Sequence, residues 1–281
     1  MIDPGLLGAV FGLASALGWG VGDFSAGLAS RRSSVFLVVL VSELSGVVIL
    51  IALAFLLSEP VPRPVDLLLG GAAGILGTIG LLFLYRGLAS GPMGVVAPVS
   101  AVVTAVVPLL YGFLLEGIPG TRQLLGFGIA IVAVWLISRP PQGGRVQPRD
   151  LGLPALAGLG FGAFLILIDH VSNRSVLWPL ISSRLASLVM LFLLVALTSQ
   201  RRRPALRQLP LMILAGLCDV GGNTFYALAA RIGRLDTAAV LSSLFPAVTV
   251  VLARIVLKER LGRQQWVGVV IAMVAVLLIS S

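Results

Sequence analysis

Three ionisable side chains lie inside long apolar runs of this sequence, where a charge is costly. They are Glu43, Arg184 and Asp219. Burying an Asp or Arg at the centre of a membrane helix costs about 2.5–3.5 kcal/mol on insertion scales, so such residues usually serve a function. A carboxylate and a guanidinium in these surroundings can bind the ammonium and the carboxylate of a zwitterion. The alternative is structural, with each group bonded to hydroxyls or to the backbone.

Asp219 is the most centrally placed acid in the sequence, near the middle of its apolar run, and Asn223 follows one helical turn later. The predicted helix around Asp219 carries no obvious arginine partner. We therefore expect Asp219 to be partly or wholly protonated near neutral pH, which would suit a proton as coupling ion. The alternative is that hydrogen bonds satisfy Asp219 as a structural residue.

Aromatic residues accompany these charges. Trp19 and Asp23 are four residues apart and so share one face of the first predicted helix. Aromatic rings can line a cavity and stack on an apolar or cationic substrate. Phe161, Tyr85 and Tyr226 are similar candidates. The alternative is that these rings only pack or anchor the helices at the membrane interface.

The composition of the chain excludes several kinds of site. One cysteine and one histidine among 281 residues exclude a disulfide framework and make a metal centre improbable. No nucleophile lies beside a base and no glycine run resembles a phosphate-binding loop, so we expect neither an enzyme nor a cofactor. The net charge of +9 comes from basic residues in short gaps between apolar runs. That placement is typical of membrane topology rather than of a nucleic-acid surface.

The elements that carry these residues are membrane helices. Apolar residues make up 58% of the chain, charged residues only 11%, and the mean hydropathy is +1.08. A water-soluble surface needs more charge, so the chain must face lipid. A helix needs about 20 apolar residues to span a bilayer. Ten runs meet that requirement: 6–29, 35–57, 66–88, 94–115, 121–138, 151–172, 176–198, 209–230, 236–257 and 264–281. We expect an all-α, multi-pass protein of the cell inner (plasma) membrane.

The second half of the chain repeats the first. A shift of 142 residues pairs Val132-Ala133-Val134 with Val274-Ala275-Val276 and Gly20 with Gly162. We infer two five-helix units, 1–138 and 151–281, joined by a loop at 139–150. Because five is odd, the second unit must start on the other side of the membrane, which makes an inverted repeat. Many secondary transporters are built in this way, with the substrate near the midplane.

The repeat also relates two of the charged residues. The shift pairs Arg184 with Ser42, the neighbour of Glu43, so the two charges occupy nearly equivalent positions of the two units. Inversion then places Glu43 and Arg184 on opposite sides of the midplane. This expectation disfavours a direct ion pair between them.

Four motifs stand out: Gly18-Trp19-Gly20, Leu115-Glu116 with Gln123 and Gly126, Ser242 to Thr249, and Leu257-Lys258-Glu259-Arg260-Leu261 with Gln265 and Gly268. Together they resemble the EamA family of the drug/metabolite transporter superfamily over essentially the whole chain. The resemblance implies a ten-helix carrier of small metabolites, commonly an exporter, and matches Trp19 to the family's tryptophan-glycine motif. It also implies a cavity between the first four helices of each unit. It does not fix the substrate.

The leading functional prediction is a secondary transporter that exports small organic metabolites, such as amino-acid-like solutes, by alternating access. Its partners are then a small-molecule substrate, protons as coupling ion and the lipid bilayer. An exporter of cationic drugs is the alternative suggested by the buried acids and aromatic rings. A membrane enzyme or a non-transporting scaffold is a third hypothesis.

The loops also predict an orientation. Odd-numbered loops hold thirteen of the Lys and Arg residues and even-numbered loops hold five. Basic loops face the cytoplasm, so both termini are expected outside the cell. The family resemblance instead implies cytoplasmic termini in many relatives, and we follow the charges.

Overall fold

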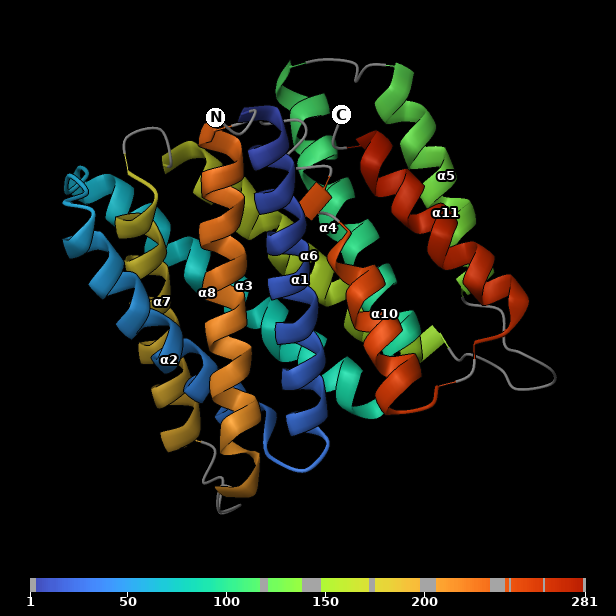
Figure 1. Ribbon diagram of the computed structural model, residues 1–281, viewed down its shortest axis with the longest axis horizontal. Helices are drawn as coiled ribbons and strands as arrows, with labels where there is room; N and C mark the ends of the chain where they lie inside the picture. Colours follow the sequence, from blue (N-terminus) through green and yellow to red (C-terminus); the bar gives the residue numbers. More distant parts are fainter. Residues whose placement is uncertain are drawn as a thin grey trace.

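The chain forms a bundle of α-helices (Figure 1). The computed structural model describes residues 4–116, 121–137, 148–171, 175–197, 206–232, 241–242, 244–259 and 261–279. Within these ranges lie α1 (Pro4–Ser30), α2 (Val35–Leu56), α3 (Pro64–Ser90), α4 (Met93–Glu116), α5 (Thr121–Ile137), α6 (Pro148–Val171), α7 (Leu177–Leu197), a 3-10 turn (Leu206–Gln208), α8 (Leu209–Ile232), α10 (Phe245–Val256) and α11 (Arg263–Ile279). Each of these ten α-helices overlaps one predicted span, which confirms the all-α fold.

Several parts of the sequence prediction lie outside the described residues. These are the connecting loop at 139–150 as far as residue 147, residues 236–240 at the start of the ninth predicted span, the motif residues Ser243 and Arg260, and the span ends at 138, 172, 198 and 280–281.

The outside of the bundle is apolar. Five helices, namely α1, α2, α3, α6 and α7, are long and apolar enough to cross a membrane. Large side chains such as Leu56, Leu114 and Leu197 are about four-fifths exposed on the protein surface. Apolar patches of this extent are rare on proteins that face water only. Lipid is therefore the solvent of these faces.

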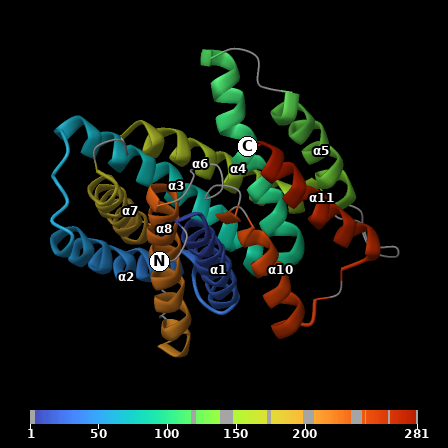
Figure 2. The same ribbon diagram turned by 45° about the horizontal axis from the view of Figure 1, so that its top comes forward.

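The helices pack in pairs that repeat in the two halves. α1 packs on α8, just as α6 packs on α3, and α1 contacts α10 as α6 contacts α4. α2 contacts α7, its own equivalent, and α5 contacts α11. The last pair forms one edge of the bundle in both views (Figures 1 and 2). This pattern is that of two units related by a two-fold axis.

Glycines show the same relation at atomic detail. A Cβ at Gly18 of α1 would lie 2.8 Å from the carbonyl oxygen of Cys218 and 2.9 Å from the backbone nitrogen of Gly222 on α8. A Cβ at Gly160 of α6 would lie 2.8 Å from the carbonyl oxygen of Leu76 and 2.9 Å from the backbone of Gly80 on α3. These two sets of residues correspond under the 142-residue shift. Small residues let membrane helices approach this closely.

One end of the bundle is tied by Glu59, which follows α2. Its carboxylate accepts hydrogen bonds from the backbone N–H groups of Val176 (2.9 Å) and Leu177 (2.8 Å) and from the Ser175 hydroxyl (3.1 Å). The first N–H groups of a helix have no partner within the helix, and a carboxylate stabilises them. A glutamate of the first half therefore caps α7 of the second half.

The opposite end is tied by Glu259, which follows α10. Its carboxylate accepts hydrogen bonds from the backbone N–H groups of Met93 and Gly94 (3.2 Å each) and pairs with Arg31 (3.2 Å). α2 runs for about 33 Å between Arg31 and Glu59, so the two glutamates lie at opposite ends of the bundle. Here a glutamate of the second half caps α4 of the first. α1 begins and α11 ends at the same end of the bundle (Figure 1).

Candidate functional site

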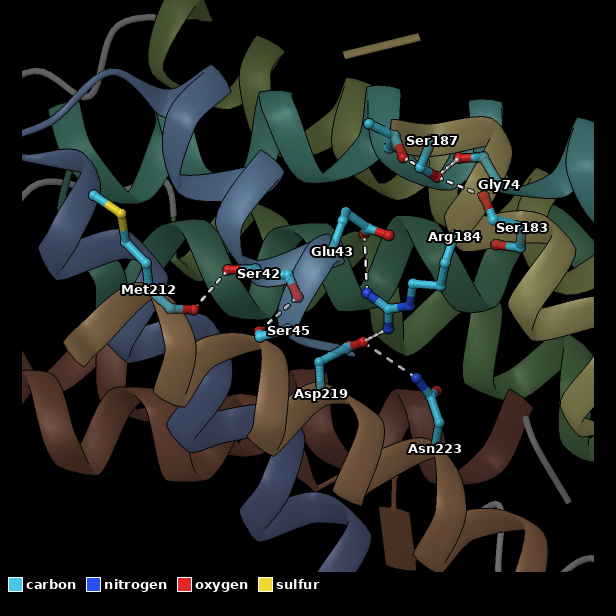
Figure 3. A network of polar contacts seen from close by, with 11 residues as sticks. Ser42, Glu43, Ser45, Gly74, Ser183, Arg184, Ser187, Met212, Asp219 and Asn223 are labelled. Carbon is cyan, nitrogen blue, oxygen red and sulfur yellow. Dashed lines mark hydrogen bonds and ion pairs between the residues drawn. The ribbon is translucent and has the colours of Figure 1, made fainter. Parts of the chain in front are cut away.

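Arg184 of α7 joins two acids from two other helices (Figure 3). Its Nη1 lies 3.0 Å from Oε1 of Glu43 on α2, and its Nη2 donates a hydrogen bond to Oδ2 of Asp219 on α8. Glu43 and Arg184 are buried, whereas the Asp219 side chain is 30% exposed. One guanidinium thus bridges α2 and α8 inside the bundle.

This geometry corrects one expectation drawn from the sequence and completes another. The expectation that inversion disfavours an ion pair between Glu43 and Arg184 is wrong, because α2 and α7 pack directly on each other and the long arginine side chain reaches across. The expectation that Asp219 lacks an arginine holds only for its own helix. Its partner Arg184 comes from α7.

Neighbouring contacts fix the two acids in place. Asn223 Nδ2 donates to Oδ2 of Asp219 at 3.2 Å, one turn along α8. The Ser42 hydroxyl, beside Glu43, donates to the Met212 carbonyl at 3.0 Å and so ties α2 to α8 (Figure 3). A Cβ at Gly46 would lie 2.9 Å from Val220 and 3.5 Å from the guanidinium carbon of Arg184. The glycine therefore leaves room for the arginine head group.

Hydroxyl groups hold the helix that carries Arg184. The single O–H of Ser187 is shared between the Gly74 carbonyl at 3.1 Å and the Ser183 carbonyl at 2.8 Å, and Thr78 Oγ1 donates to Ser187 Oγ at 2.6 Å. These bonds fix α7 against α3 one turn from Arg184 (Figure 3). The sequence interpretation missed them. Hydroxyl residues flanking Arg184 within an apolar span were the signal available.

The cluster formed by Glu43, Arg184 and Asp219 has one more acid than base. With all three ionised its formal charge is −1. Glu43 Oε2 is buried and has no hydrogen-bond partner among the described residues. Each terminal nitrogen of Arg184 already faces a carboxylate. The cluster therefore attracts a ligand that carries a positive charge.

Two further candidates join the cluster electrostatically. Asp23 of α1 is half-buried and close enough to Asp219 for their charges to interact. Tyr85 of α3 is 3% exposed and interacts with Asp23, Asp219, Glu43 and Arg184. Asp23 has no hydrogen bond or ion pair within the described ranges. It adds a third carboxyl group beside the single arginine.

The aromatic candidates divide into two groups. The Trp19 ring lies 5.9 Å from that of Tyr226 on α8 and 6.0 Å from that of Phe245 on α10. Asp219, Asn223 and Tyr226 share one face of α8, so this aromatic group continues the line of the acids. Phe245 belongs to a sequence motif quoted above but was not predicted as a site residue.

Phe161 lies apart from this aromatic group. A Cβ at Gly80 would be 2.9 Å from the Phe161 ring. This contact is the equivalent, in the other half, of Trp19 against Gly222. Where Trp19 has Tyr226 and Phe245 beside it, Phe161 packs against the large buried apolar cluster that contains Tyr85.

The described residues hold no group of three or more His, Cys, Asp or Glu side chains that could bind a metal ion. The site consists of acids, one arginine, an amide and aromatic rings. Such a set can bind a positively charged group and can gain or lose a proton.

Known proteins resemble the chain in sequence pattern and in fold. The model of the EamA-like transporter family matches residues 6–139 and 151–281. No curated protein matches the sequence significantly. A solved structure titled "Crystal structure of protein" has 15% sequence identity and a TM-score of 0.67, with 96% of this chain and 95% of that chain covered. At this identity the likeness concerns the fold alone.

Proposed function

Because the chain belongs to the EamA-like transporter family of membrane transporters, we propose that it is a secondary transporter that exports small organic metabolites bearing a protonated amine. Amino-acid-like solutes are the leading substrate class. The observation that carries this proposal is the buried cluster in which one arginine serves two acids, with Asp23 nearby.

The charge of the cluster supports recognition of an amine. Arg184 already binds Glu43 and Asp219, so in this conformation it does not offer a free guanidinium to a substrate carboxylate. Asp219 is the more exposed acid and Asp23 lies nearby, so an ammonium group would approach these two. Trp19 and Tyr226 would then stack on the cation or on an apolar side chain of the substrate.

The two ends of the bundle support alternating access. Glu59 and Glu259 each cap a helix of the other half, at opposite ends. Inverted-repeat transporters work by rocking one bundle against another around a central site. Release of the contacts at one end, while those at the other end hold, would open one face at a time. Protons are the coupling ion and the cell inner membrane is the location in this proposal.

A second candidate is the export of organic cations such as drugs. The specific observation in its favour is the occupancy of both terminal nitrogens of Arg184, which leaves the cluster with no free positive group for a carboxylate. A permanent cation needs only the acids and the rings. The two candidates differ in whether the substrate carboxylate contributes.

Counterflow in proteoliposomes tests the proposal. Vesicles are loaded with unlabelled leucine, the quaternary cation tetraethylammonium, or N-acetyl-leucine, and the uptake of labelled leucine or tetraethylammonium is followed. We expect exchange with a solute that carries a positive charge and none with N-acetyl-leucine, which lacks the ammonium. Exchange of tetraethylammonium without leucine would favour the cation exporter. Equal exchange with N-acetyl-leucine, or none at all, would contradict the proposed recognition of an amine.

A further inference from the structure

The Glu43 carboxylate is the least satisfied polar group of the cluster. Glu43 is 3% exposed, its Oε1 faces Arg184 at 3.0 Å, and its Oε2 has no hydrogen-bond partner among the described residues. An ionised carboxylate that lacks partners in an apolar interior is strongly unfavourable. A proton on Oε2 removes that charge.

We propose that Glu43, rather than Asp219, is the residue that carries the coupling proton, and that this proton and a cationic substrate occupy the cluster in turn. The inference rests on the proposed function as a transporter and names the coupling residue within it. The sequence alone favoured Asp219, because that acid is the most central and has no arginine on its own helix.

The surroundings of the two acids decide between them. Asp219 receives hydrogen bonds from Arg184 and Asn223, and its side chain is 30% exposed. Hydrogen-bond donors and partial solvation stabilise an ionised carboxylate. Within the part of the chain that the structure describes, Glu43 has one partner, Arg184, which it shares with Asp219. The single positive charge of Arg184 therefore balances the ionised carboxylate of Asp219. Glu43 is then the acid that holds the proton.

The other groups that face Glu43 act in the same direction. α2 packs against α1, α3, α7 and α8. From these helices Asp23, Tyr85, Arg184 and Asp219 contribute to the electrostatics of the cluster. Among them only Arg184 is positive. Asp219 opposes a negative charge on Glu43, and burial in the apolar interior acts in the same direction. Burial and Asp219 together favour the protonated form of Glu43.

Charge neutrality then links the proton to the substrate. With Glu43 protonated, Arg184 and Asp219 balance each other and the cluster is neutral. When an ammonium group binds Asp219, Arg184 remains with Glu43, whose proton leaves from Oε2 to water. The cluster, now with two carboxylates, one guanidinium and one bound cation, is again neutral. Each bound positive charge thus replaces one proton, which is the exchange that a proton-driven exporter needs.

Infrared spectroscopy of the purified protein without substrate tests the protonation directly. In the difference between the spectra of the wild type and Glu43→Gln we expect the carbonyl stretching band of a protonated carboxylic acid near neutral pH. A band of Asp23 is present in both spectra and cancels. Asp219→Asn should also remove the Glu43 band, because Arg184 then pairs with Glu43 alone and ionises it. Asp23→Asn is the matched control and should keep the Glu43 band. Absence of the band from the first difference, or its loss in Asp23→Asn, would overturn the assignment.

Transport provides a second readout. Uptake of the labelled amine is compared with and without an imposed pH gradient in the same vesicles. We expect the ratio of the two rates to exceed one in the wild type and to fall to one in Glu43→Gln, whatever the absolute rate. A ratio that stays at the wild-type value in Glu43→Gln contradicts the inference. Absence of counterflow in the wild type would instead defeat the proposed function, and the infrared result does not depend on it. Glu43→Asp keeps the infrared test decisive should Glu43→Gln fail to fold, because it keeps a carboxyl group at position 43 and should shift the band, whereas a proton on Asp219 would leave the band unchanged.

Discussion

At the scale of single residues, Arg184 holds the cluster together. It is buried in α7, and each of its terminal nitrogens faces an acid of another helix. A buried ion pair adds little compared with a well-packed apolar replacement, but removal of one partner leaves the other charge uncompensated. The same contacts that neutralise Arg184 therefore make it indispensable to the fold around it.

We predict that Arg184→Gln destabilises the protein by about 3–5 kcal/mol, the usual cost of breaking a buried pair from one side. The ionised Asp219 carboxylate then remains without its cation. Adding Asp219→Asn should recover part of this loss, because no unbalanced charge is then left in the cluster. Thermal unfolding in detergent measures both variants.

The control is Arg122→Gln. Arg122 is exposed at the start of α5 and makes no ion pair among the described residues. Exposed charges contribute little to stability, so the midpoint should barely change. If Arg184→Gln behaves like Arg122→Gln, or if the double variant is less stable than the single one, the cluster does not balance charge in the way described.

At the scale of helices, glycine contacts hold the two halves in register. Gly18 lets α1 approach α8, and Gly160 lets α6 approach α3 through the corresponding atoms. In lipid there is no hydrophobic drive between helices, so close packing provides much of their attraction. These two contacts are the clearest structural counterpart of the sequence repeat, because equivalent residues make them in the two halves.

We predict that Gly18→Ala and Gly160→Ala lower stability by similar amounts, on the order of 1–3 kcal/mol, as in other overpacked interiors. In each case the added methyl group would meet backbone atoms, which cannot move aside as a flexible side chain can. Gly128→Ala on α5 is the matched control, because a Cβ there meets nothing within 4 Å. Thermal melting of the three variants is the measurement. A neutral result at Gly18 with a large loss at Gly160 would refute equivalent packing.

At the scale of the whole molecule, the sequence predicts the architecture better than the site. Apolar runs of sufficient length and a constant 142-residue shift are properties of the chain itself, so the ten helices and the repeat could be predicted. Glu43, Arg184 and Asp219 could be singled out because charges stand out in apolar runs. Their pairing could not be predicted, since it depends on which helices touch. The length of the arginine side chain also matters, because it reaches across the two-fold axis.

The same limit applies to Trp19. The residue is recognisable from its motif, but its neighbours Tyr226 and Phe245 come from α8 and α10. Such contacts between distant segments depend on how the helices pack. They cannot be predicted from helix periodicity. Glu59 and Glu259 are further examples, because each caps a helix more than a hundred residues away in the chain.

The orientation of the whole molecule is open to a simple test. The bias of thirteen basic residues in odd loops against five in even loops predicts that both termini lie outside the cytoplasm. Reporters that are active only on one side of the membrane, fused to the C-terminus, should report the outer side. A cytoplasmic signal would show that helix packing overrides the loop charges in this chain.

The central claim is that the cluster lies on the path of the substrate and is reached from each face in turn. Cysteine accessibility tests it most directly, because the chain has a single native cysteine that can be removed. The variant Cys218→Ser with Asn223→Cys places a thiol one turn from Asp219. Val189→Cys in the same background is the control, since Val189 is 62% exposed on the apolar surface of α7.

A membrane-impermeant cationic thiol reagent is applied to vesicles of either orientation. We predict that position 223 is labelled from both faces, that a bound amine substrate slows the labelling, and that position 189 is labelled from neither face. Labelling of position 223 from one face only under every condition, or from neither face, would contradict alternating access at this cluster.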